Sequence, residues 1–236
     1  MSEFGLAEGD TLGRRKMKRE LVNKGRALLR DKGWPIPNSW LRGDEQFIRR
    51  VARELTRRDT VIDLGAHVGI AAIEFSHHAG RVLAYEPHPE IFQTLRRNVR
   101  NYRRIVPINK AIWTEEGSLD LFFGSDGRTD KPTEGSTLMH GKSNLDYQES
   151  ASVETVKLSD VIDGIEGGVR LIKMDIEGAE ARVIAELVET PAVEKVDKVY
   201  VETHEDRIEG LGAELDAVRS RIEALGLTSK FDFTWP

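Results

Sequence analysis

The sequence predicts a doubly wound α/β fold, and three observations lead to this expectation. From Thr60 onward, short apolar runs alternate with helical patterns, which is typical of parallel strands joined by crossover helices. No internal repeat or low-complexity tract interrupts the alternation. At 236 residues, the chain has the length of one well-buried α/β domain. Sheets of this kind bind their ligands at the carboxyl ends of the central strands.

Helices are expected before Thr60. Residues 17–30 have an amphipathic pattern, and the two prolines of the following GWPIPNSW end that helix. A second helix begins at Asp44, a favourable N-cap. Its inward stripe consists of Phe47, Ile48, Val51, Ala52 and Leu55. We expect residues 1–59 to form a helical cap without an independent fold, and residues 60–236 to form the main domain.

The alternating region begins with three predicted strands, TVIDLGA (60–66), RVLAYEP (81–87) and IVPINKAI (105–112). A helix is expected over 69–78, and Pro89 opens the next one. SLDLFFG (118–124) and SVETVKL (152–158) are predicted to form an added antiparallel pair. The polar, glycine-rich insert 124–150 lies between them, and a long irregular insert in a compact domain is more often functional than accidental.

Two further strands follow, VRLIKMDIE (169–177) and KVYVETH (198–204), with a helix from Ala179 between them. Residues 208–225 repeat apolar positions at steps of three and four, which predicts a helix with one buried stripe. The last segment, LTSKFDFTWP (227–236), is expected to add a final strand.

Composition excludes several classes of protein. No apolar run approaches the ~18 residues needed to cross a bilayer, so no membrane span is expected. The start MSEFGLAEGD lacks the pattern of a secretory signal, which leads us to expect a cytoplasmic protein. The absence of cysteine removes disulfides, zinc–thiolate sites, iron–sulfur clusters and thiolate nucleophiles.

The first glycine turn favours a nucleoside cofactor. In VIDLGAHVG the strand ends in Asp63, the chain turns at Gly65, and Gly69 lets the next helix approach closely. Glu86 follows at the end of the second strand, placed to accept hydrogen bonds from both ribose hydroxyls. The G-x-G-x-x-G and Walker patterns are absent. Because Asp63 would repel a pyrophosphate and attract an ammonium group, the charge favours S-adenosylmethionine.

Several motifs resemble the FkbM-type family of S-adenosylmethionine-dependent methyltransferases. They are VIDLGAHVG, AYEPHPEIFQTLRRN, KAIW, VKLSDVI, LIKMDIEGAE and YVETH, in the expected order from about Glu45 to His204. LIKMDIEGAE is the most discriminating of them. The family's turn usually reads D-x-G-A-N-x-G, so His67 departs from it at the asparagine position.

The resemblance implies a Rossmann-like methyltransferase sheet and a set of cofactor contacts. Asp63, Gly65, Ala66, His67 and Gly69 would hold the methionine end, Glu86 with Pro87 the ribose, and Asn109 to Ala111 the adenine. The acceptor would lie over the fourth and fifth strands, with Asp175 bordering both ligands. Such enzymes methylate hydroxyls of sugars or of secondary metabolites, so the implied partner is a small-molecule or glycan acceptor.

Three residues are candidates for catalysis: Asp175, Glu202 and His204. In a doubly wound sheet, Asp175 should open beside the Asp63 turn, and Glu202 and His204 are two apart on one strand face. His204 as general base is one hypothesis, and Asp175 with Glu202 around a magnesium ion is another. The structural alternative is a buried Lys173–Asp175 ion pair, with Glu177 favouring a helix start.

The remaining histidines carry less information. His77, His78 and His88 are expected to be solvated or capping residues, and His140 lies in the polar insert. His67 is expected to be a turn residue that contacts the cofactor rather than a metal ligand, because no partner histidine or cysteine lies at ligand spacing.

Two other functions stay open at this point. RNA ribose 2′-O-methylation is motivated by a basic amino-terminal part, with 15 Lys/Arg against 9 Asp/Glu in residues 1–60, and by RRNVRNYRR at 96–104. These arginines cannot share one helix face, so nucleic acid is not the expected partner. The second alternative is a non-catalytic scaffold that binds S-adenosylmethionine. Oligomeric state cannot be inferred from the sequence.

Overall fold

The structure is a computed structural model that describes residues 43–124, 137, 145–205, 208 and 210–235. The chain divides into two units, residues 1–46 and 47–236, and the description below concerns the second unit. The helix predicted over 17–30 lies outside the described residues. The expectation that residues 1–59 form a cap therefore stays a prediction.

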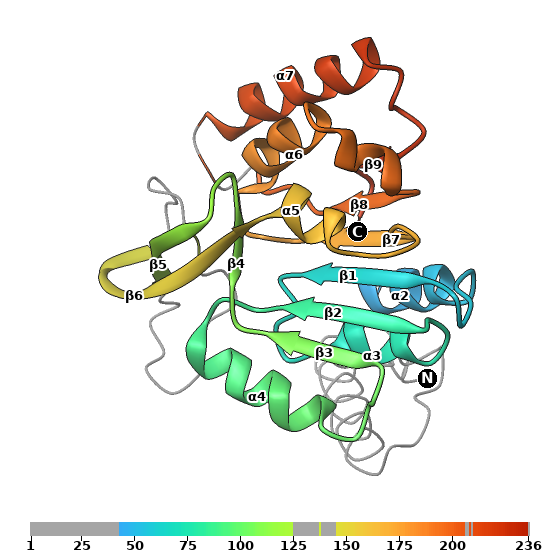
Figure 1. Cartoon of the computed structure of the whole chain (residues 1–236). Helices are drawn as coiled ribbons and strands as arrows, with labels where there is room; N and C mark the ends of the chain where they lie inside the picture. Colours follow the sequence, from blue (N-terminus) through green and yellow to red (C-terminus); the bar gives the residue numbers. More distant parts are fainter. Residues whose placement is uncertain (1–42, 125–136, 138–144, 206–207, 209, 236) are drawn as a thin grey trace, which may run out of the picture. The chain divides into compact units, whose positions relative to one another are not determined.

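A six-stranded parallel sheet forms the centre of the second unit (Figure 1). Its order is β3-β2-β1-β7-β8-β9, and every neighbouring pair is parallel. The strands are β1 (Thr60–Leu64), β2 (Arg81–Tyr85), β3 (Ile105–Ile108), β7 (Leu171–Met174), β8 (Val199–Val201) and β9 (Phe231–Asp232). The predicted α/β class and the predicted final strand are confirmed.

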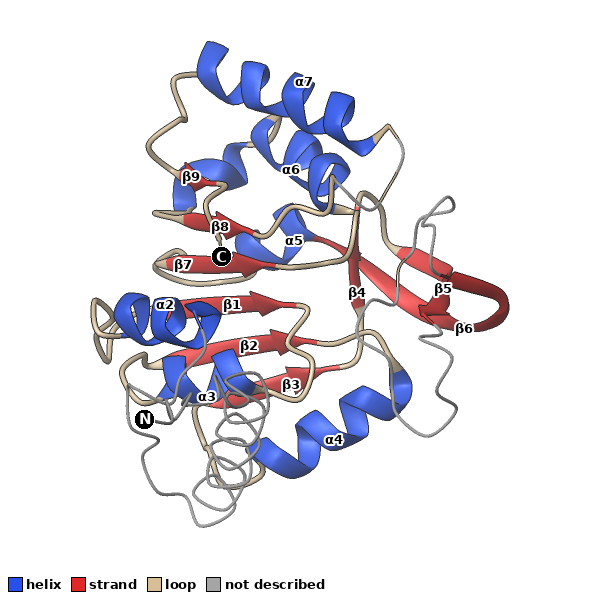
Figure 2. Ribbon diagram, turned by 180° about the vertical axis from the view of Figure 1, so that it is seen from behind, coloured by secondary structure: helices blue, strands red, loops and turns tan. Residues whose placement is uncertain are grey.

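The two faces of the sheet bury alternate residues of each strand. On β1, Val61 belongs to a core with buried residues of α2 (Gly43–Ala52), α3 (Ile70–Ser76) and α4 (Pro89–Val99). Ile62 belongs to the opposite core, which contains residues of α5 (Leu158–Asp163), α6 (Glu180–Val188), the 3₁₀ helix η2 (Pro191–Lys195) and α7 (Leu211–Ala224). Figure 2 shows α3 against one face of β1 to β3 and α5 on the other side. Helices therefore cover both faces, as a doubly wound fold requires.

A second, three-stranded sheet has the order β4-β6-β5. It consists of β4 (Ala111–Trp113), β5 (Gly117–Gly124) and β6 (Leu145–Lys157), and the predicted antiparallel pairing of β5 with β6 is confirmed. In Figure 1 this sheet stands beyond the carboxyl ends of the central strands. β6 begins before the expected Ser152, so the last part of the predicted irregular insert is a strand.

The prediction of one strand over 105–112 is wrong. The chain leaves the central sheet after Ile108, and β4 instead pairs with β6 through Ala111 and Thr155. Asn109 explains the break, because its side-chain amide donates to the carbonyl oxygens of Glu86 and Pro87 at 2.8 and 2.9 Å. These bonds hold the chain at the end of β2, so residues 109–112 do not continue β3.

The ends of other elements also differ from expectation. β8 ends at Val201, so Glu202 and His204 follow the strand instead of lying on it. The last helix begins at Leu211 rather than at Ile208. His88 caps α4, since its Nδ1 accepts from the amide of Glu90 at 3.2 Å, which confirms a capping role.

The described part of the chain contains no helix with the length and apolar character of a membrane span.

Candidate functional site

The candidate site lies where β1, β2, β7 and β8 end. At Gly65 the backbone has φ 72°, and a Cβ atom would lie 1.8 Å from the carbonyl oxygen of Asp175. Only glycine permits this approach, because a Cβ atom would clash with that oxygen, and the left-handed conformation is also unfavourable for most other residues. The expectation that Asp175 opens beside the Asp63 turn is confirmed.

The turn after β1 contains a second unusual conformation at His67, which has φ 49°. Asparagine and histidine are both enriched in the left-handed region, so histidine at the usual asparagine position preserves the backbone of the turn. The amide of His67 donates to Glu86 Oε2 at 2.8 Å. Gly69, with φ 94°, completes the turn, and a Cβ there would lie 2.8 Å from Leu95 of α4. The close approach at Gly69 is that of α4, whereas the sequence predicted it for the helix that directly follows the turn.

Glu86 joins the loops that follow β1 and β2. Its Oε1 accepts from the amide of His88 at 2.8 Å, while Oε2 accepts from His67. Burial raises the pKa of Glu86 to about 7, although these two amides and Lys173 lower it in part. Each carboxylate oxygen has two acceptor positions, so each can take one further hydrogen bond. The carboxylate is therefore suited to a ligand with two neighbouring hydroxyls.

A buried lysine lies between the ends of β1 and β7. Lys173 is the register partner of Asp63, and its Nζ lies 3.7 Å from Asp63 Oδ1 and 3.0 Å from Asp175 Oδ2. Nζ also donates to the carbonyl of Gly65 at 2.9 Å. Burial would lower the pKa of Lys173, but Asp175 and Asp63 outweigh burial and raise it. The predicted Lys173–Asp175 ion pair is confirmed.

Asp63 itself is wholly buried. Within the described residues, neither of its carboxylate oxygens has a hydrogen-bond partner. Burial raises its pKa, and Lys173 opposes that shift. Because the side chain of Asp63 is not exposed, its expected contact with a ligand ammonium group stays a prediction.

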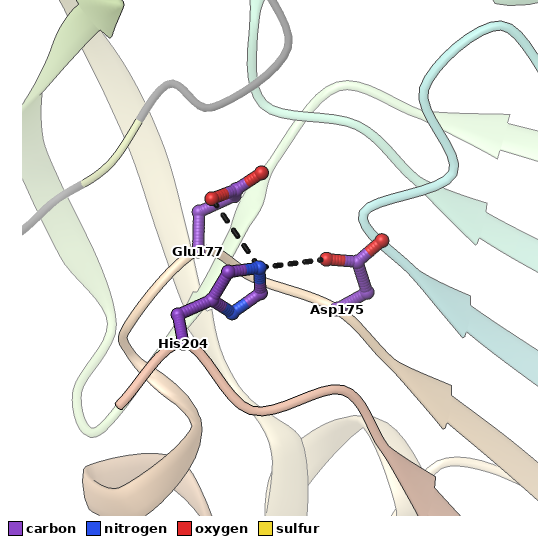
Figure 3. A group of neighbouring side chains, drawn as sticks. All are labelled: Asp175, Glu177 and His204. Carbon is purple, nitrogen blue, oxygen red and sulfur yellow. Dashed lines mark ion pairs between the residues drawn. The ribbon is translucent and has the colours of Figure 1, made fainter. Parts of the chain in front are cut away.

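His204 lies beside three carboxylates, two of which, those of Asp175 and Glu177, are drawn in Figure 3. Its side chain is 1% exposed, its Nδ1 lies 3.1 Å from Glu180 Oε1, and its Nε2 lies 3.4 Å from Glu177 Oε2. Asp175 Oδ1 lies 3.6 Å from the same Nε2. Burial would lower the pKa of His204, but these three carboxylates raise it further than burial lowers it. The surroundings therefore favour the imidazolium ion.

Glu180 was not among the residues that the sequence singled out. Its side chain is fully buried, and its carboxylate accepts from the amides of Ile176 and Gly178 at 3.0 and 2.9 Å. Glu180 therefore fixes the loop between β7 and α6, and it also contacts the Nδ1 atom of His204. Its place in LIKMDIEGAE, three residues after Glu177, was the available signal.

Glu202 also belongs to this group. Its amide donates to the carbonyl of Met174 at 2.9 Å, which keeps it beside β7. Burial and the negative charge of Asp175 raise the pKa of Glu202 to about 7. In contrast, burial would raise the pKa of Asp175, but Lys173 and His204 lower it. The three predicted catalytic residues therefore alter one another's pKa values. Glu202 and His204 do so although they lie beyond the end of β8.

Metal-ligand geometry brings together a different set from the predicted one. Ligand atoms of Asp175, Glu177 and His204 lie within 4.8 Å of one another in the described part of the chain. The predicted magnesium pair was Asp175 with Glu202. Sequence reasoning missed Glu177 because it assigned this residue to the helix start.

The chain is similar to known methyltransferases. A family model described as "Methyltransferase FkbM domain" matches residues 63–227. The chain is 27% identical over 168 residues to the hexuronic acid methyltransferase AglP of Haloferax volcanii. This match covers 70% of the chain and 64% of that relative, so the chain spans less than two thirds of the relative's length.

Two solved structures are also similar to part of the chain. A methyltransferase FkbM from Methylobacillus flagellatus has a TM-score of 0.47 at 18% identity, covering 70% of this chain and 38% of that one. A putative methyltransferase from Streptococcus mutans, solved in complex with SAH, has a TM-score of 0.43 at 12% identity. The match covers 78% of this chain and 82% of that one.

Proposed function

Because the chain belongs to the FkbM methyltransferase domain family, we propose that it is an S-adenosylmethionine-dependent O-methyltransferase. Its acceptor is a hydroxyl of a sugar, a glycan or a secondary metabolite. The observation that supports this most strongly is the convergence of Glu86, the Gly65 turn and the Asp175 group at one edge of the sheet.

The residues present suit the cofactor. Glu86 would accept hydrogen bonds from the ribose hydroxyls, with Pro87 beside it, and the segment from Asn109 to Ala111 would border the adenine. The turn of residues 65–69 would hold the methionine end. Carboxylates outnumber cationic side chains here, which suits a ligand with sulfonium and ammonium groups and opposes a pyrophosphate. When bound, S-adenosylmethionine supplies an electrophilic methyl group.

Glu202 is the proposed general base. A base works best when its pKa lies near the working pH, and the raised pKa of Glu202, about 7, meets this condition. His204 is proposed to donate a hydrogen bond rather than to accept a proton, since its carboxylate neighbours favour the imidazolium ion. Asp175 stays ionised and holds His204 and Lys173 in place.

The magnesium hypothesis gives Glu202 a different role. A magnesium ion held by Asp175 and Glu202 would orient the acceptor oxygen and favour its ionised form. Treatment with a chelator separates the two roles. Loss of activity in EDTA and its return with magnesium supports the metal site, and full activity in EDTA removes it.

A sugar acceptor is favoured by the likeness to a hexuronic acid methyltransferase. The test has two steps. Calorimetric titration with S-adenosylmethionine must show binding to the protein, and Glu86→Gln must weaken it. Incubation with saccharides, small alcohols and RNA then identifies the acceptor by a mass gain of one methylene. Binding without transfer to any acceptor would instead support the non-catalytic scaffold, and transfer to RNA would support the ribose alternative.

A further inference from the structure

We propose that the carboxylate of Glu177 accepts hydrogen bonds from hydroxyl groups of the acceptor molecule. We also propose that Thr137 of the insert is the residue that positions Glu177. This inference rests on the proposed function and specifies a polyol as the acceptor.

The backbone at Glu177 is held in the left-handed region, with φ 55°. This region favours glycine, and a glutamate there is strained unless surrounding contacts hold it. Glycine at this position would remove the strain and also the carboxylate. The presence of a long acidic side chain at such a position therefore indicates that the side chain has a use.

Contacts from two parts of the chain hold this conformation. Thr137 Oγ1 donates to the carbonyl oxygen of Glu177 at 2.6 Å. On the other side, Glu180 accepts from the amides of Ile176 and Gly178, the residues that flank Glu177. The backbone of Glu177 is thus fastened both by the insert and by the first turn of α6.

Thr137 is itself held by backbone hydrogen bonds to β5. It is wholly buried, and its amide and carbonyl both pair with Phe122 of β5, at 3.0 and 2.9 Å. Because these bonds fix Thr137 against β5, its hydroxyl connects the second sheet directly to the loop after β7. The insert therefore has a physical route by which it acts on the site.

The carboxylate of Glu177 lies beside the imidazole of His204. Oε2 lies 3.4 Å from His204 Nε2, and in Figure 3 the other oxygen points away from His204. The side chain is 21% exposed, whereas those of Glu180 and His204 are 0% and 1% exposed. A ligand can therefore reach Glu177 without displacing the buried pair.

The chemistry of this carboxylate defines the kind of acceptor. Each oxygen accepts up to two hydrogen bonds, so a carboxylate suits neighbouring hydroxyl groups. Glu202 interacts electrostatically with both Asp175 and Glu177, so further carboxylate oxygens that can accept hydroxyl hydrogen bonds lie in the same region. A polyol with adjacent hydroxyls, such as a sugar ring, fits this set.

The test compares Glu177→Gly with Glu177→Gln in the full chain. Glycine accommodates φ 55°, so the melting temperature of Glu177→Gly should equal or exceed that of the wild type. S-adenosylmethionine affinity should be unchanged in both variants. The KM for the sugar acceptor should rise about ten- to hundredfold in Glu177→Gly, the usual effect of losing a hydrogen bond to a charged group. Glu177→Gln, which keeps one acceptor oxygen, should show a smaller rise.

Thr137→Val tests the positioning role, with Thr137→Ser as the control that keeps the hydroxyl. Thr137→Val should raise the acceptor KM in the wild-type background and leave it unchanged in the Glu177→Gly background, because it acts through Glu177. Retained S-adenosylmethionine affinity shows that the variant is folded.

Two results would overturn this inference and leave the proposed function standing. One is an unchanged acceptor KM in Glu177→Gly, and the other is an equal effect of Thr137→Val on the acceptor KM in the wild-type and Glu177→Gly backgrounds. A wild-type protein that binds S-adenosylmethionine and methylates no hydroxyl acceptor overturns the proposed function, and the inference with it.

Discussion

The backbone amide of His67 donates a 2.8 Å hydrogen bond to the carboxylate of Glu86, which fastens the turn after β1 to the end of β2. This contact uses the main chain of His67 and not its imidazole. It also requires the left-handed backbone at His67, since φ is 49° there. The identity of the side chain therefore matters mainly through the conformations that it permits.

His67→Asn and His67→Gly should both preserve the turn, because both residues tolerate the left-handed region. His67→Ala should lower the free energy of unfolding by about 1–2 kcal/mol. S-adenosylmethionine affinity, measured by calorimetry, should be retained in the first two variants. Loss of affinity in both of them would mean that the imidazole itself contacts the cofactor.

Glu86 should make cofactor binding depend on pH. The carboxylate form accepts ribose hydroxyls, and burial raises its pKa to about 7. S-adenosylmethionine affinity should therefore fall as the pH decreases through 7. Glu86→Gln should bind the cofactor about tenfold more weakly and lack this dependence. An affinity that is constant between pH 6 and 8 in the wild type would contradict the assignment.

The same pKa has a consequence for stability. A carboxyl group with a raised pKa in the folded state stabilises the fold when protonated, and this contribution is lost as the pH rises from 4.5, the ordinary pKa of the group, to about 7. Glu86→Gln, which stays neutral, should remove this part of the pH dependence of the melting temperature.

Glu202 should determine the acidic limb of the rate profile. Its raised pKa of about 7 means that it takes up a proton, and stops acting as a base, as the pH falls below that value. Glu202→Gln should lower kcat about 10²- to 10⁴-fold while preserving cofactor affinity. The measurement is kcat against pH at saturating substrates, and retention of most of the wild-type kcat would assign the base elsewhere.

Lys173 should be a major determinant of stability. Removal of one partner from a buried ion pair costs about 3–5 kcal/mol, because the other charge is left uncompensated. Lys173→Met should lower the free energy of unfolding by this amount at neutral pH, since Asp63 and Asp175 lie 3.7 and 3.0 Å from its Nζ. Combining it with Asp63→Asn should recover part of the loss, and a purely additive double variant would show that Asp63 and Lys173 are not coupled.

Much of the central sheet was predictable because its signals are local. Apolar runs, glycine turns and helix-opening residues such as Pro89 indicate strands and helices within a few residues. The adjacency of Asp63 and Asp175 followed from the strand order of a doubly wound sheet. The turn at Gly65 was predicted from the glycine that follows the apolar strand in VIDLGAHVG.

The features that sequence reasoning missed depend on contacts between distant segments. Nothing local in IVPINKAI shows that the Asn109 side chain bonds to the end of β2 and breaks the strand. Glu177 was expected only to favour a helix start, and Glu180 was not singled out, since their contacts with Thr137 and His204 join residues 40 and 24 positions apart. The pKa of Glu202 is raised by burial and by the charge of Asp175, and the pKa of His204, which burial would lower, is raised by the carboxylates of Glu180, Glu177 and Asp175. The fold brings these groups together, and their spacing in the sequence does not show it.

The most direct test of the central claim follows the methyl group itself. S-adenosylmethionine carrying a trideuterated methyl group is incubated with the protein and a panel of saccharides that includes hexuronic acids, and the products are weighed by mass spectrometry. The account predicts transfer of the labelled methyl to a sugar hydroxyl, and loss of that transfer in Glu202→Gln. No labelled saccharide product, from a protein shown to bind the cofactor, would contradict it.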